Sequence, residues 1–394
     1  MKKFMKQLGI EFKRIFSNGV LLAIFFGAPL LYGLLFGYVY QQAKVVDLPI
    51  VIVDQDNSPL TDKIIEGFED NEVLLVKDVR ATSGNLLAEM PREQYAAVIT
   101  FPSNFEADIL QKRYPEVRVD LNMVNILNAN TASTNIQSVL MTLNAGMEIE
   151  GLQKQGLHPN QALNSFESFK VNYNKLYNSA GNYVTFMLPG LLATIMQQII
   201  FLAMALVFAR DFEDGYFGKL AQEHKWATYH LFLKSVPFLL MLPVMWYLVS
   251  LFIPYFKIDA FIYNGPMLVL TALLTLASMF IGMLFSIAIP SQLKATELLM
   301  VISTPAFVLS GFTWPSLAIP DTITNVAQYI PLTQYLSGFR KVGFYGGDMA
   351  SIQPEIHMLS MIIVVTLLAM LALLQFKIFS ARKKQNKILS QPQN

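Results

Sequence analysis

Residues that could do chemistry are few in this chain and lie far apart. The histidines are His158, His224, His230 and His357, and the chain contains no cysteine. No His-Glu-x-x-His pair and no Gly-x-Ser-x-Gly nucleophile motif occurs, so the spacing supports neither a zinc site nor a serine hydrolase. We therefore predict no catalytic, metal-binding or cofactor-binding residue on this chain.

Two short segments contain residue types found in phosphate-binding or calcium-binding loops, but without the spacing that such loops require. The segment 215–220, Gly-Tyr-Phe-Gly-Lys-Leu, is the nearest approach to a phosphate-binding loop. It lacks the required glycine spacing and the hydroxyl residue that would meet magnesium, so ATP hydrolysis by this chain is not expected. Asp54, Asp56 and Asn57 offer calcium-type oxygens, but the further ligands of a calcium loop are missing. We interpret these three residues as turn and helix-capping residues.

Long apolar stretches dominate the rest of the sequence, in which 54% of residues are hydrophobic and 14% are charged. Six stretches are nearly free of charge: Val20–Tyr40, Val184–Ala209, Ser235–Ile253, Pro266–Ile289, Leu298–Gly311 and Ile356–Phe376. Most approach the roughly 20 residues that a spanning helix needs, and they lack the alternation of barrel strands. The sequence therefore predicts an α-helical polytopic membrane protein with six transmembrane helices.

The positive charges predict its topology, because lysine and arginine are retained on the cytoplasmic side of a membrane. They gather before the first span, in 1–19, in the loop 210–230, and in the basic tail 380–394. Both termini are therefore expected in the cytoplasm, with spans two to six and their loops in 184–379. The first apolar stretch, 20–40, is too long for a signal peptide and no cleavage site follows it, so we expect it to remain as an anchor.

Between the first two spans lie about 140 mostly polar residues, 41–183, which we expect to form an inserted α/β extracytoplasmic domain. Leu48–Val53 is a β-rich run, and Ser58 and Pro59 provide the N-cap and first residue of a helix through Glu69. Further strands are predicted at 73–76, 95–101 and 117–124, and further helices at 83–90 and 131–156. Without disulfides, a hydrophobic core must hold this domain together.

Two segments next to predicted spans have sequence patterns that differ from those of the spans. Residues 1–19 place apolar side chains at helical spacing among basic ones, which predicts an amphipathic helix in the membrane interface; a frayed basic leader is the alternative. At the other end, the fifth span runs into prolines that cannot continue a helix. We expect a broken helix at the external surface, followed by the external segment 312–345, that acts as a gate. The gate residues are Ser310, Gly311, Phe312, Trp314, Pro315 and Pro320. Trp314 would serve equally well as an interface anchor.

This order of parts resembles the membrane (permease) subunit of ATP-binding cassette (ABC) type-2 exporters, in the subgroup with a large extracytoplasmic domain between the first and second spans. The family carries a pattern like Arg-Glu-x-Glu-x-Gly-Thr, followed by Leu, in the helix that docks on its ATPase. Here 210–216 reads Arg-Asp-Phe-Glu-Asp-Gly-Tyr and precedes Leu220, with Asp for the first Glu and Tyr for Thr. The resemblance thus implies coupling residues Arg210, Asp211, Glu213, Gly215 and Leu220. It also implies that the external segment 312–345 re-enters the membrane as short helices before the last span.

The resemblance also implies the partners. A cytoplasmic ABC ATPase subunit would bind ATP and magnesium, a second permease copy or paralogue would complete the pathway, and a periplasmic adaptor protein could join the assembly in the bacterial inner membrane. Membrane lipid surrounds the spans, and a net charge of +1 argues against nucleic acid. Gln197 and Gln198 would face the pathway between protomers or pack against a neighbouring helix.

Three functions remain open at this point. The first is export of drug-like, lipid or other amphipathic substrates, powered by the separate ATPase. The second is a membrane-anchored sensor or scaffold whose extracytoplasmic domain binds a ligand, although signalling would not need five further spans. The third, a lipid-modifying enzyme, would need a clustered base or metal set, and the sequence contains none.

Overall fold

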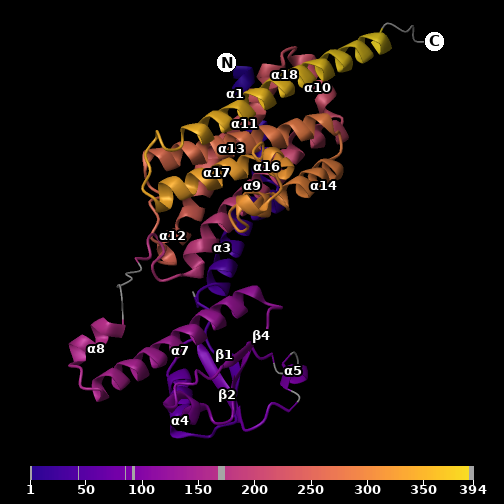
Figure 1. Cartoon of the computed structure of the whole chain (residues 1–394). Helices are drawn as coiled ribbons and strands as arrows, with labels where there is room; N and C mark the ends of the chain where they lie inside the picture. The colour runs from indigo at the N-terminus through magenta and orange to yellow at the C-terminus, as the bar shows by residue number, and fades with distance from the viewer. Residues whose placement is uncertain (1, 43, 85, 91–93, 167–173, 390–394) are drawn as a thin grey trace. The chain divides into compact units, whose positions relative to one another are not determined.

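The computed structural model describes residues 2–42, 44–84, 86–90, 94–166 and 174–389. It divides the chain into two compact units, which Figure 1 shows as a helical bundle and a smaller sheet with helices. The bundle unit joins Met1–Ala43 to Lys175–Asn394, and the inserted unit is Lys44–Asn174. The inserted unit thus interrupts the bundle once, between its first and second apolar helices.

The inserted unit is built on a four-stranded sheet in the order β2-β1-β3-β4. Strands β1, β2 and β3 are parallel, and β4 is antiparallel to β3. The strands are β1 (Leu48–Asp54), β2 (Leu74–Arg80), β3 (Ala97–Phe101) and β4 (Arg118–Leu121). The helices are α4 (Pro59–Glu69), α5 (Leu86–Glu89), α6 (Phe105–Leu110), α7 (Ile126–Lys154) and α8 (Pro159–Phe166). The predicted strands are confirmed, whereas the helix predicted at 83–90 is shorter and the one predicted at 131–156 begins earlier.

Alternate residues of β1 serve two small cores. Ile50 and Ile52 are buried with Phe68 of α4 and Ile136 of α7. Val51 and Val53 are buried on the opposite face of the sheet, with Leu86 of α5. Because side chains alternate along a strand, one apolar run can supply both faces. Both faces of the central strand are therefore covered within a unit of this size.

The acidic turn after β1 caps two helices. Asp54 Oδ1 accepts hydrogen bonds from the backbone N–H groups of Asp56 and Asn57 at 3.1 and 3.0 Å, and Ser58 forms a capping box with Thr61. Asp56 Oδ2 accepts from the N–H of Glu106, at the start of α6, at 2.9 Å. Burial opposes the Asp56 charge, but the N–H donors outweigh it and lower the pKa of Asp56. The interpretation of these residues as turn and capping residues is confirmed.

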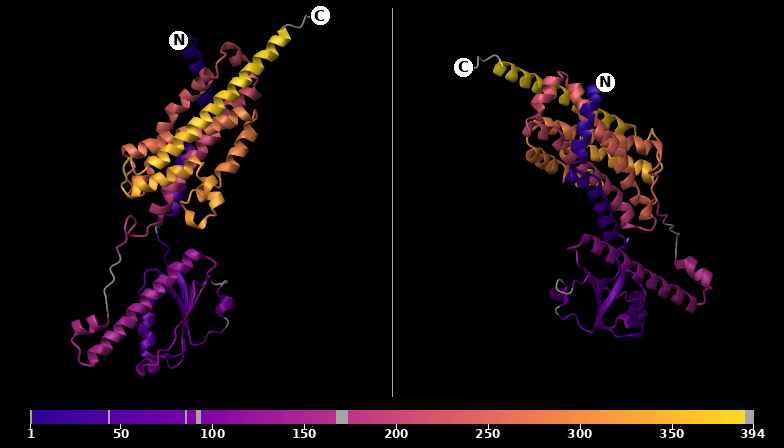
Figure 2. Two further views of the ribbon diagram at one scale, coloured as in Figure 1. Left: turned by 45° about the horizontal axis from the view of Figure 1, so that its top comes forward. Right: turned by 180° about the vertical axis from the view of Figure 1, so that it is seen from behind.

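Among its described residues, the bundle unit contains five helical stretches long and apolar enough to cross a membrane. They are Tyr183–Glu213, Ala227–Tyr255, Gly265–Ala288, Gln292–Leu309 and Gln353–Lys383. The elements of these stretches and of the segments around them are α1 (Lys2–Phe16), α2 (Gly19–Leu22), η1 (Ala23–Gly27), α3 (Ala28–Val39), α9 (Tyr183–Glu213), α10 (Tyr216–Glu223), α11 (Ala227–Ser250), α12 (Phe252–Tyr255), α13 (Gly265–Ala288), α14 (Gln292–Ser303), α15 (Ala306–Leu309), η2 (Ser316–Ala318), α16 (Asp321–Ala327), α17 (Pro331–Phe339), η3 (Arg340–Phe344) and α18 (Gln353–Leu389). Figure 2 shows the same bundle from two further sides.

Three of the six predicted spans differ from a single continuous helix. The third ends as α11 at Ser250 and resumes as the short α12 at Phe252. The first is divided into α2, the π-helical turn η1 and α3, so its apolar helix, Ala23–Val39, is shorter than a typical span. Pro29 explains the division, because a proline ring crowds the preceding turn and provides no N–H for its hydrogen bond. The fifth already ends at Ser303 and resumes as the short α15 after Pro305, earlier than the sequence predicted.

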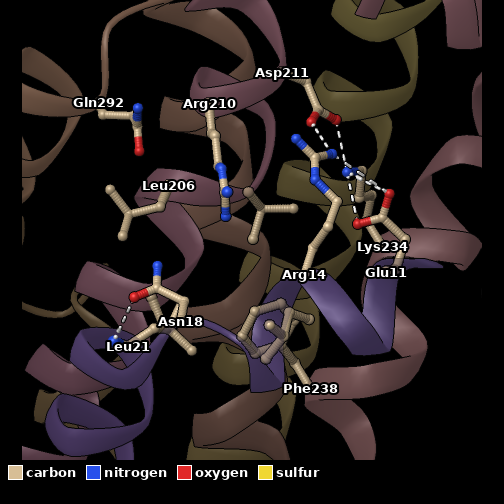
Figure 3. A pocket seen from close by; sticks show the side chains of 13 residues that line it. Glu11, Arg14, Asn18, Leu21, Leu206, Arg210, Asp211, Lys234, Phe238 and Gln292 are labelled. Atoms are coloured by element: carbon tan, nitrogen blue, oxygen red, sulfur yellow. Dashed lines mark hydrogen bonds and ion pairs between the residues drawn. The ribbon is translucent and has the colours of Figure 1, made fainter. Parts of the chain in front are cut away.

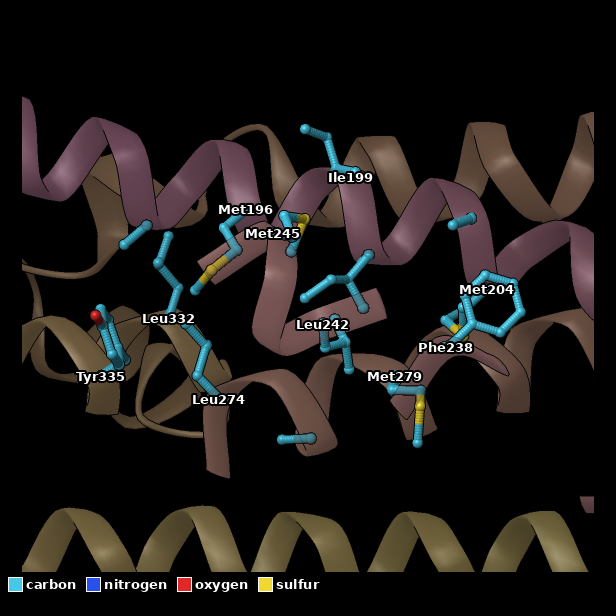
Figure 4. Packing of buried hydrophobic residues seen from close by; sticks show 14 of the residues in the cluster. Met196, Ile199, Met204, Phe238, Leu242, Met245, Leu274, Met279, Leu332 and Tyr335 are labelled. Atoms are coloured by element: carbon cyan, nitrogen blue, oxygen red, sulfur yellow. The ribbon is translucent and has the colours of Figure 1, made fainter. Parts of the chain in front are cut away.

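Helix α9 is the centre of the bundle unit, and 72% of the most apolar part of this helix is buried. It packs closely along α13, and Figure 4 shows Met204 of α9 beside Phe238 of α11 within the buried cluster that these helices share. Ser286 of α13 donates to the carbonyl of Ala205 at 2.6 Å and accepts from the N–H groups of Phe208 and Ala209, both at 2.9 Å. Small residues at a helix interface permit this approach.

Replacing Gly282 with alanine is expected to force α9 and α13 apart. A Cβ atom at Gly282 would lie 2.5 Å from Met204 Cβ, which cannot rotate away. We expect a cost of about 1–3 kcal/mol in unfolding free energy, as for other overpacked cores. A matched Gly9→Ala change in α1, where nothing lies within 4 Å of the new Cβ, should instead stabilise by about 0.5–1 kcal/mol. Denaturant unfolding of the detergent-solubilised protein measures both, and equal effects would refute this packing argument.

Candidate functional site

Four charged side chains from three helices meet inside the bundle unit. Lys234 Nζ of α11 lies 2.8 Å from both carboxylate oxygens of Glu11 in α1, and 2.6 Å from Asp211 Oδ2 in α9. Arg14 of α1 donates to Asp211 Oδ1 at 2.7 Å. Figure 3 shows these side chains pointing toward one another. We call Glu11, Arg14, Asp211 and Lys234 the charge cluster.

The charge cluster is buried and electrically balanced. The side chains of Lys234, Glu11 and Asp211 are only 3%, 6% and 1% exposed. Because a buried charge is stable only when it is paired, two carboxylates facing two cations satisfy each other. The cluster therefore fixes α1 against the end of α9 and the beginning of α11.

Arg14 extends this contact to the loop between α9 and α10. Its guanidinium lies 3.3 Å from Asp214 Oδ2 and 4.5 Å from the ring centre of Tyr216. Burial opposes the Arg14 charge, but the field of Asp211, its hydrogen bond and Glu11 outweigh burial and raise the pKa of Arg14. Arg14 therefore stays charged, and one side chain joins α1 to both α9 and the following loop.

The residues predicted for coupling occupy this same region but differ in exposure. Asp211 and Leu220 are buried, whereas Glu213 and Gly215 are exposed and Arg210 is half-buried. Glu213 Oε1 accepts from the backbone N–H of Gln292 at 2.8 Å and its other oxygen accepts from the Gln292 amide, which ties α9 to α14. Arg210 lies 3.6 Å from Asp214 in the same turn. The structure thus brings Arg210, Asp211 and Glu213 together with α1, α11 and α14.

Gly215 allows the chain to turn from α9 into α10. Its φ of +67° is in the left-handed region that side-chain-bearing residues rarely adopt, and nothing lies within 4 Å of a Cβ built there. Its role is therefore conformational. Leu220 lies on the inner face of α10, together with Phe217 and Ala221.

Helix α10 is held on its other sides as well. The Gln7 side chain of α1 hydrogen-bonds Glu223 and Tyr229. Arg382 of α18 donates to the carbonyl of Gln222 at 3.1 Å, and Gln375 donates to that of Lys225 at 2.9 Å. Movement of α10 would therefore be transmitted to α1 and α18 as well as to α9.

A small pocket adjoins the charge cluster. Its volume is about 70 Å³, and Leu206, Arg210 and Gln292 line it beside the cluster residues. Drug-sized ligands occupy pockets of roughly 300–1,000 Å³. The pocket is thus too small for such a substrate, and the cluster is better described as a mechanical joint than as a binding site.

The segment after α15 contains a second ordered contact, at the opposite end of α9. Arg340 donates to the carbonyl of Gly311 at 3.1 Å and to that of Phe312 at 2.5 Å, with its guanidinium 4.4 Å from the Phe312 ring centre. The Phe312 ring is 2% exposed and fills the space left by Gly190, where a Cβ would lie 2.5 Å from the ring. We call Arg340, Phe312 and Gly190 the aromatic latch.

The other predicted gate residues surround this latch without joining it. Ser310 donates to the carbonyl of Phe307 at 2.6 Å and accepts from the N–H of Phe312 at 3.2 Å. Trp314 is 54% exposed, and Pro315 and Pro320 lie at the starts of η2 and α16. The predicted re-entrant stretch 312–345 is therefore a succession of short helices.

Gln197 and Gln198 point in different directions, as neighbours on a helix must. Gln197 is fully buried, and among the described residues neither atom of its amide has a hydrogen-bond partner; Gln198 is half-buried. Gln197 therefore faces the interior of its own bundle. Among the described residues, no three His, Asp or Glu side chains form a group that could hold a metal ion.

Sequence reasoning missed Glu11, Arg14, Lys234 and Arg340 as site residues. Two signals were present. Glu11 is the only acidic residue among the first 46, and Lys234 stands immediately before an otherwise apolar stretch. An isolated charge of either kind requires a partner when buried, but the sequence does not show which partner it meets.

Several spanning helices, an inserted α/β unit and a charge cluster that joins the helix ends define this chain as a polytopic membrane protein. The family model "ABC-2 family transporter protein" matches residues 20–372. The chain belongs to this family and is the membrane subunit of a transporter, which confirms the resemblance to ABC type-2 membrane subunits. It is 22% identical to the inner membrane transport permease YhhJ of Escherichia coli (strain K12) over 319 residues, covering 78% of this chain and 79% of that protein. The YhhJ permease of Shigella flexneri gives the same identity and coverage.

Proposed function

We propose that this chain is the permease half of an ATP-driven exporter that moves drug-like, lipid or other amphipathic substrates out of the cytoplasm or inner leaflet. The chain lies in the bacterial inner membrane with both termini in the cytoplasm and the inserted unit outside. A separate cytoplasmic ABC ATPase binds ATP and magnesium, and a second permease copy or paralogue completes the pathway. A periplasmic adaptor can meet the inserted unit in a cell with an outer membrane.

The charge cluster is the observation that supports this proposal best. Transport requires that a small movement at the ATPase become a rigid displacement of several spans. Glu11, Arg14, Asp211 and Lys234 join the first helix, the end of α9 and the beginning of α11 through ion pairs of 2.6–2.8 Å. Such a joint moves these elements as one body when α10 is displaced.

The exposed surface formed by the α9–α10 loop and the adjoining helix α10 is the ATPase docking site in this proposal. Asp214 and Gly215 of the loop and Lys219 of α10 are exposed there. Asp211 and Leu220 are buried, so they position the loop from within and do not contact the ATPase directly. This assignment divides the coupling motif into an inner half that holds the loop and an outer half that meets the partner.

The two permease copies meet in this proposal along a helical stretch that is poorly covered within one chain. The α14 stretch is only 22% buried and exposes Leu293, Val301 and Val308, and of the described stretches only that of α18, at 17%, is less buried. Ser310 and the half-buried Gln198 lie near the pathway between the copies, while the aromatic latch closes its outer end. Lipid covers the remaining apolar faces.

Co-purification tests the ATPase partnership. The tagged permease, extracted gently from its own membranes, is expected to carry a soluble subunit with a phosphate-binding loop, identified by mass spectrometry. Lys219→Glu reverses an exposed charge on α10 and should reduce the recovered ATPase by about tenfold, the loss expected when an interfacial charge becomes repulsive. Lys77→Glu, at an exposed lysine of β2 in the inserted unit, should leave recovery unchanged.

The alternatives give different results in the same experiment. If no such subunit is recovered with any variant, the exporter proposal fails and a membrane-anchored sensor or scaffold becomes the better explanation. If the ATPase is recovered equally with Lys219→Glu, the exporter stands but the docking site lies elsewhere. Substrate-stimulated ATPase activity of the recovered complex then identifies the substrate class.

A further inference from the structure

The inserted unit exposes a compact apolar tip where β4 leads into α7. Met123, Val124, Ile126 and Leu127 are 55%, 96%, 62% and 46% exposed. No charged residue occurs from Leu121 to Met147. Scattered exposed apolar residues are normal, but four within five positions of an uncharged stretch mark an interaction surface. We call these four residues the apolar tip.

The apolar tip is held in position by two asparagines. The side-chain oxygen Oδ1 of Asn122 accepts from the backbone N–H of Val124 at 3.2 Å. Its side-chain Nδ2 donates to the backbone carbonyl of Tyr95 at 3.2 Å. Asn125 caps α7 by accepting from the N–H groups of Leu127 and Asn128 at 3.1 and 3.2 Å. Side-chain oxygens therefore satisfy three backbone N–H groups of the turn, and the exposed apolar side chains belong to an ordered turn.

The strand register places this tip at one particular edge of the sheet. Leu121 pairs with Ala97, and Ala97 pairs with Ile50 near the beginning of β1. The tip therefore lies at the edge where the chain enters the sheet. Leu48, the first residue of β1, follows Val39, the last residue of α3, by only nine positions. An extended chain spans at most about 3.6 Å per residue, so this edge is within roughly 30 Å of the end of the first apolar helix.

We propose that the apolar tip inserts into the lipid surface and docks the inserted unit on the bilayer. A bilayer must surround the end of the first apolar helix, and the short connection keeps the tip within its reach. Aliphatic side chains without neighbouring charges suit the boundary between headgroups and acyl chains. This inference is independent of the transported substrate and of the ATPase.

The absence of cysteine from the chain makes a direct test possible, because a single introduced cysteine carries the only label. Val124→Cys places an environment-sensitive bimane dye on the most exposed residue of the tip. Tyr114→Cys is the matched control, since Tyr114 is 88% exposed and precedes β4, at the other end of that strand. Both full-length variants are reconstituted in phosphatidylcholine and phosphatidylglycerol vesicles, with or without lipids that carry a nitroxide near the headgroup in both leaflets.

Insertion predicts a blue-shifted dye at position 124 whose fluorescence falls about twofold when nitroxide lipids are included, with little change at position 114. Emission at 124 that matches the control, without quenching, would show that the tip is in water and would overturn the proposal. A blue shift without nitroxide quenching would also overturn it, because a protein surface, such as a second copy, would then cover the tip. Substitution of a residue as exposed as Val124 leaves the core intact, so misfolding does not obscure the result.

Discussion

Replacing Lys234 with methionine is expected to destabilise the bundle unit by about 3–5 kcal/mol, the cost of removing one partner from a buried ion pair. The Lys234 ammonium contacts Glu11 and Asp211 at 2.6–2.8 Å, and all three side chains are at most 6% exposed. Without it, two buried carboxylates share the single cation Arg14. Methionine keeps the volume of the lysine side chain, so the loss reports the unpaired charge and not a cavity.

A second change should recover most of this loss. In the Glu11→Gln/Lys234→Met double variant, Arg14 and Asp211 remain as a neutral pair 2.7 Å apart. Replacing both members of a buried pair is often close to neutral in stability, so the double variant should lie nearer to the wild type than to Lys234→Met. The interaction free energy between the two substitutions then measures the contact between Glu11 and Lys234.

Denaturant unfolding of the solubilised protein measures these effects, with Lys63→Met as a matched control. Lys63 lies 3.8 Å from Glu150, with both side chains more than half exposed, so its loss should cost less than about 1 kcal/mol. Equal losses for Lys234→Met and Lys63→Met, or a double variant as unstable as the sum of its single changes, would show that the charge cluster does not hold the bundle together.

Much of the fold could be predicted because its signals are local. The apolar run of β1, the Ser58–Pro59 helix start and the long uncharged stretches each depend on residues near one another in sequence. The division of the first span was missed although Pro29 was visible, because a proline within an apolar stretch can be accommodated in a spanning helix. Its effect on the preceding turn depends on how the neighbouring helices pack.

The candidate site was predicted less completely, because its contacts join distant parts of the chain. The motif from Arg210 to Leu220 indicated the right region, yet it could not show that Asp211 and Leu220 turn inward while Gly215 and Lys219 face outward. Glu11 and Lys234 are 223 positions apart. No periodicity or capping rule relates residues at such a separation, so only the packing of α1 against α9 and α11 identifies them.

Loss of the Arg340 side chain is expected to release the segment after α15. Its guanidinium satisfies two carbonyls, those of Gly311 and Phe312, and an unpaired buried polar group costs about 1–3 kcal/mol. Hydrogen exchange followed by mass spectrometry should therefore show at least about tenfold faster exchange over residues 310–316 in Arg340→Met, since about 1.4 kcal/mol corresponds to a factor of ten.

Two further variants test whether the two-pronged geometry of the Arg340 guanidinium is what keeps hydrogen exchange slow in this segment. Arg340→Lys should also open the segment, because an ammonium is a point donor and cannot reproduce the two-pronged contact over the Phe312 ring. Arg113→Met, which removes an arginine 67% exposed and 3.5 Å from Asp108, should leave exchange at 310–316 unchanged. Wild-type exchange in both Arg340 variants would mean that Phe312, packed against Gly190, holds the segment by itself. If the proposed gate is correct, faster exchange there should be accompanied by leakage of substrate in the absence of ATP.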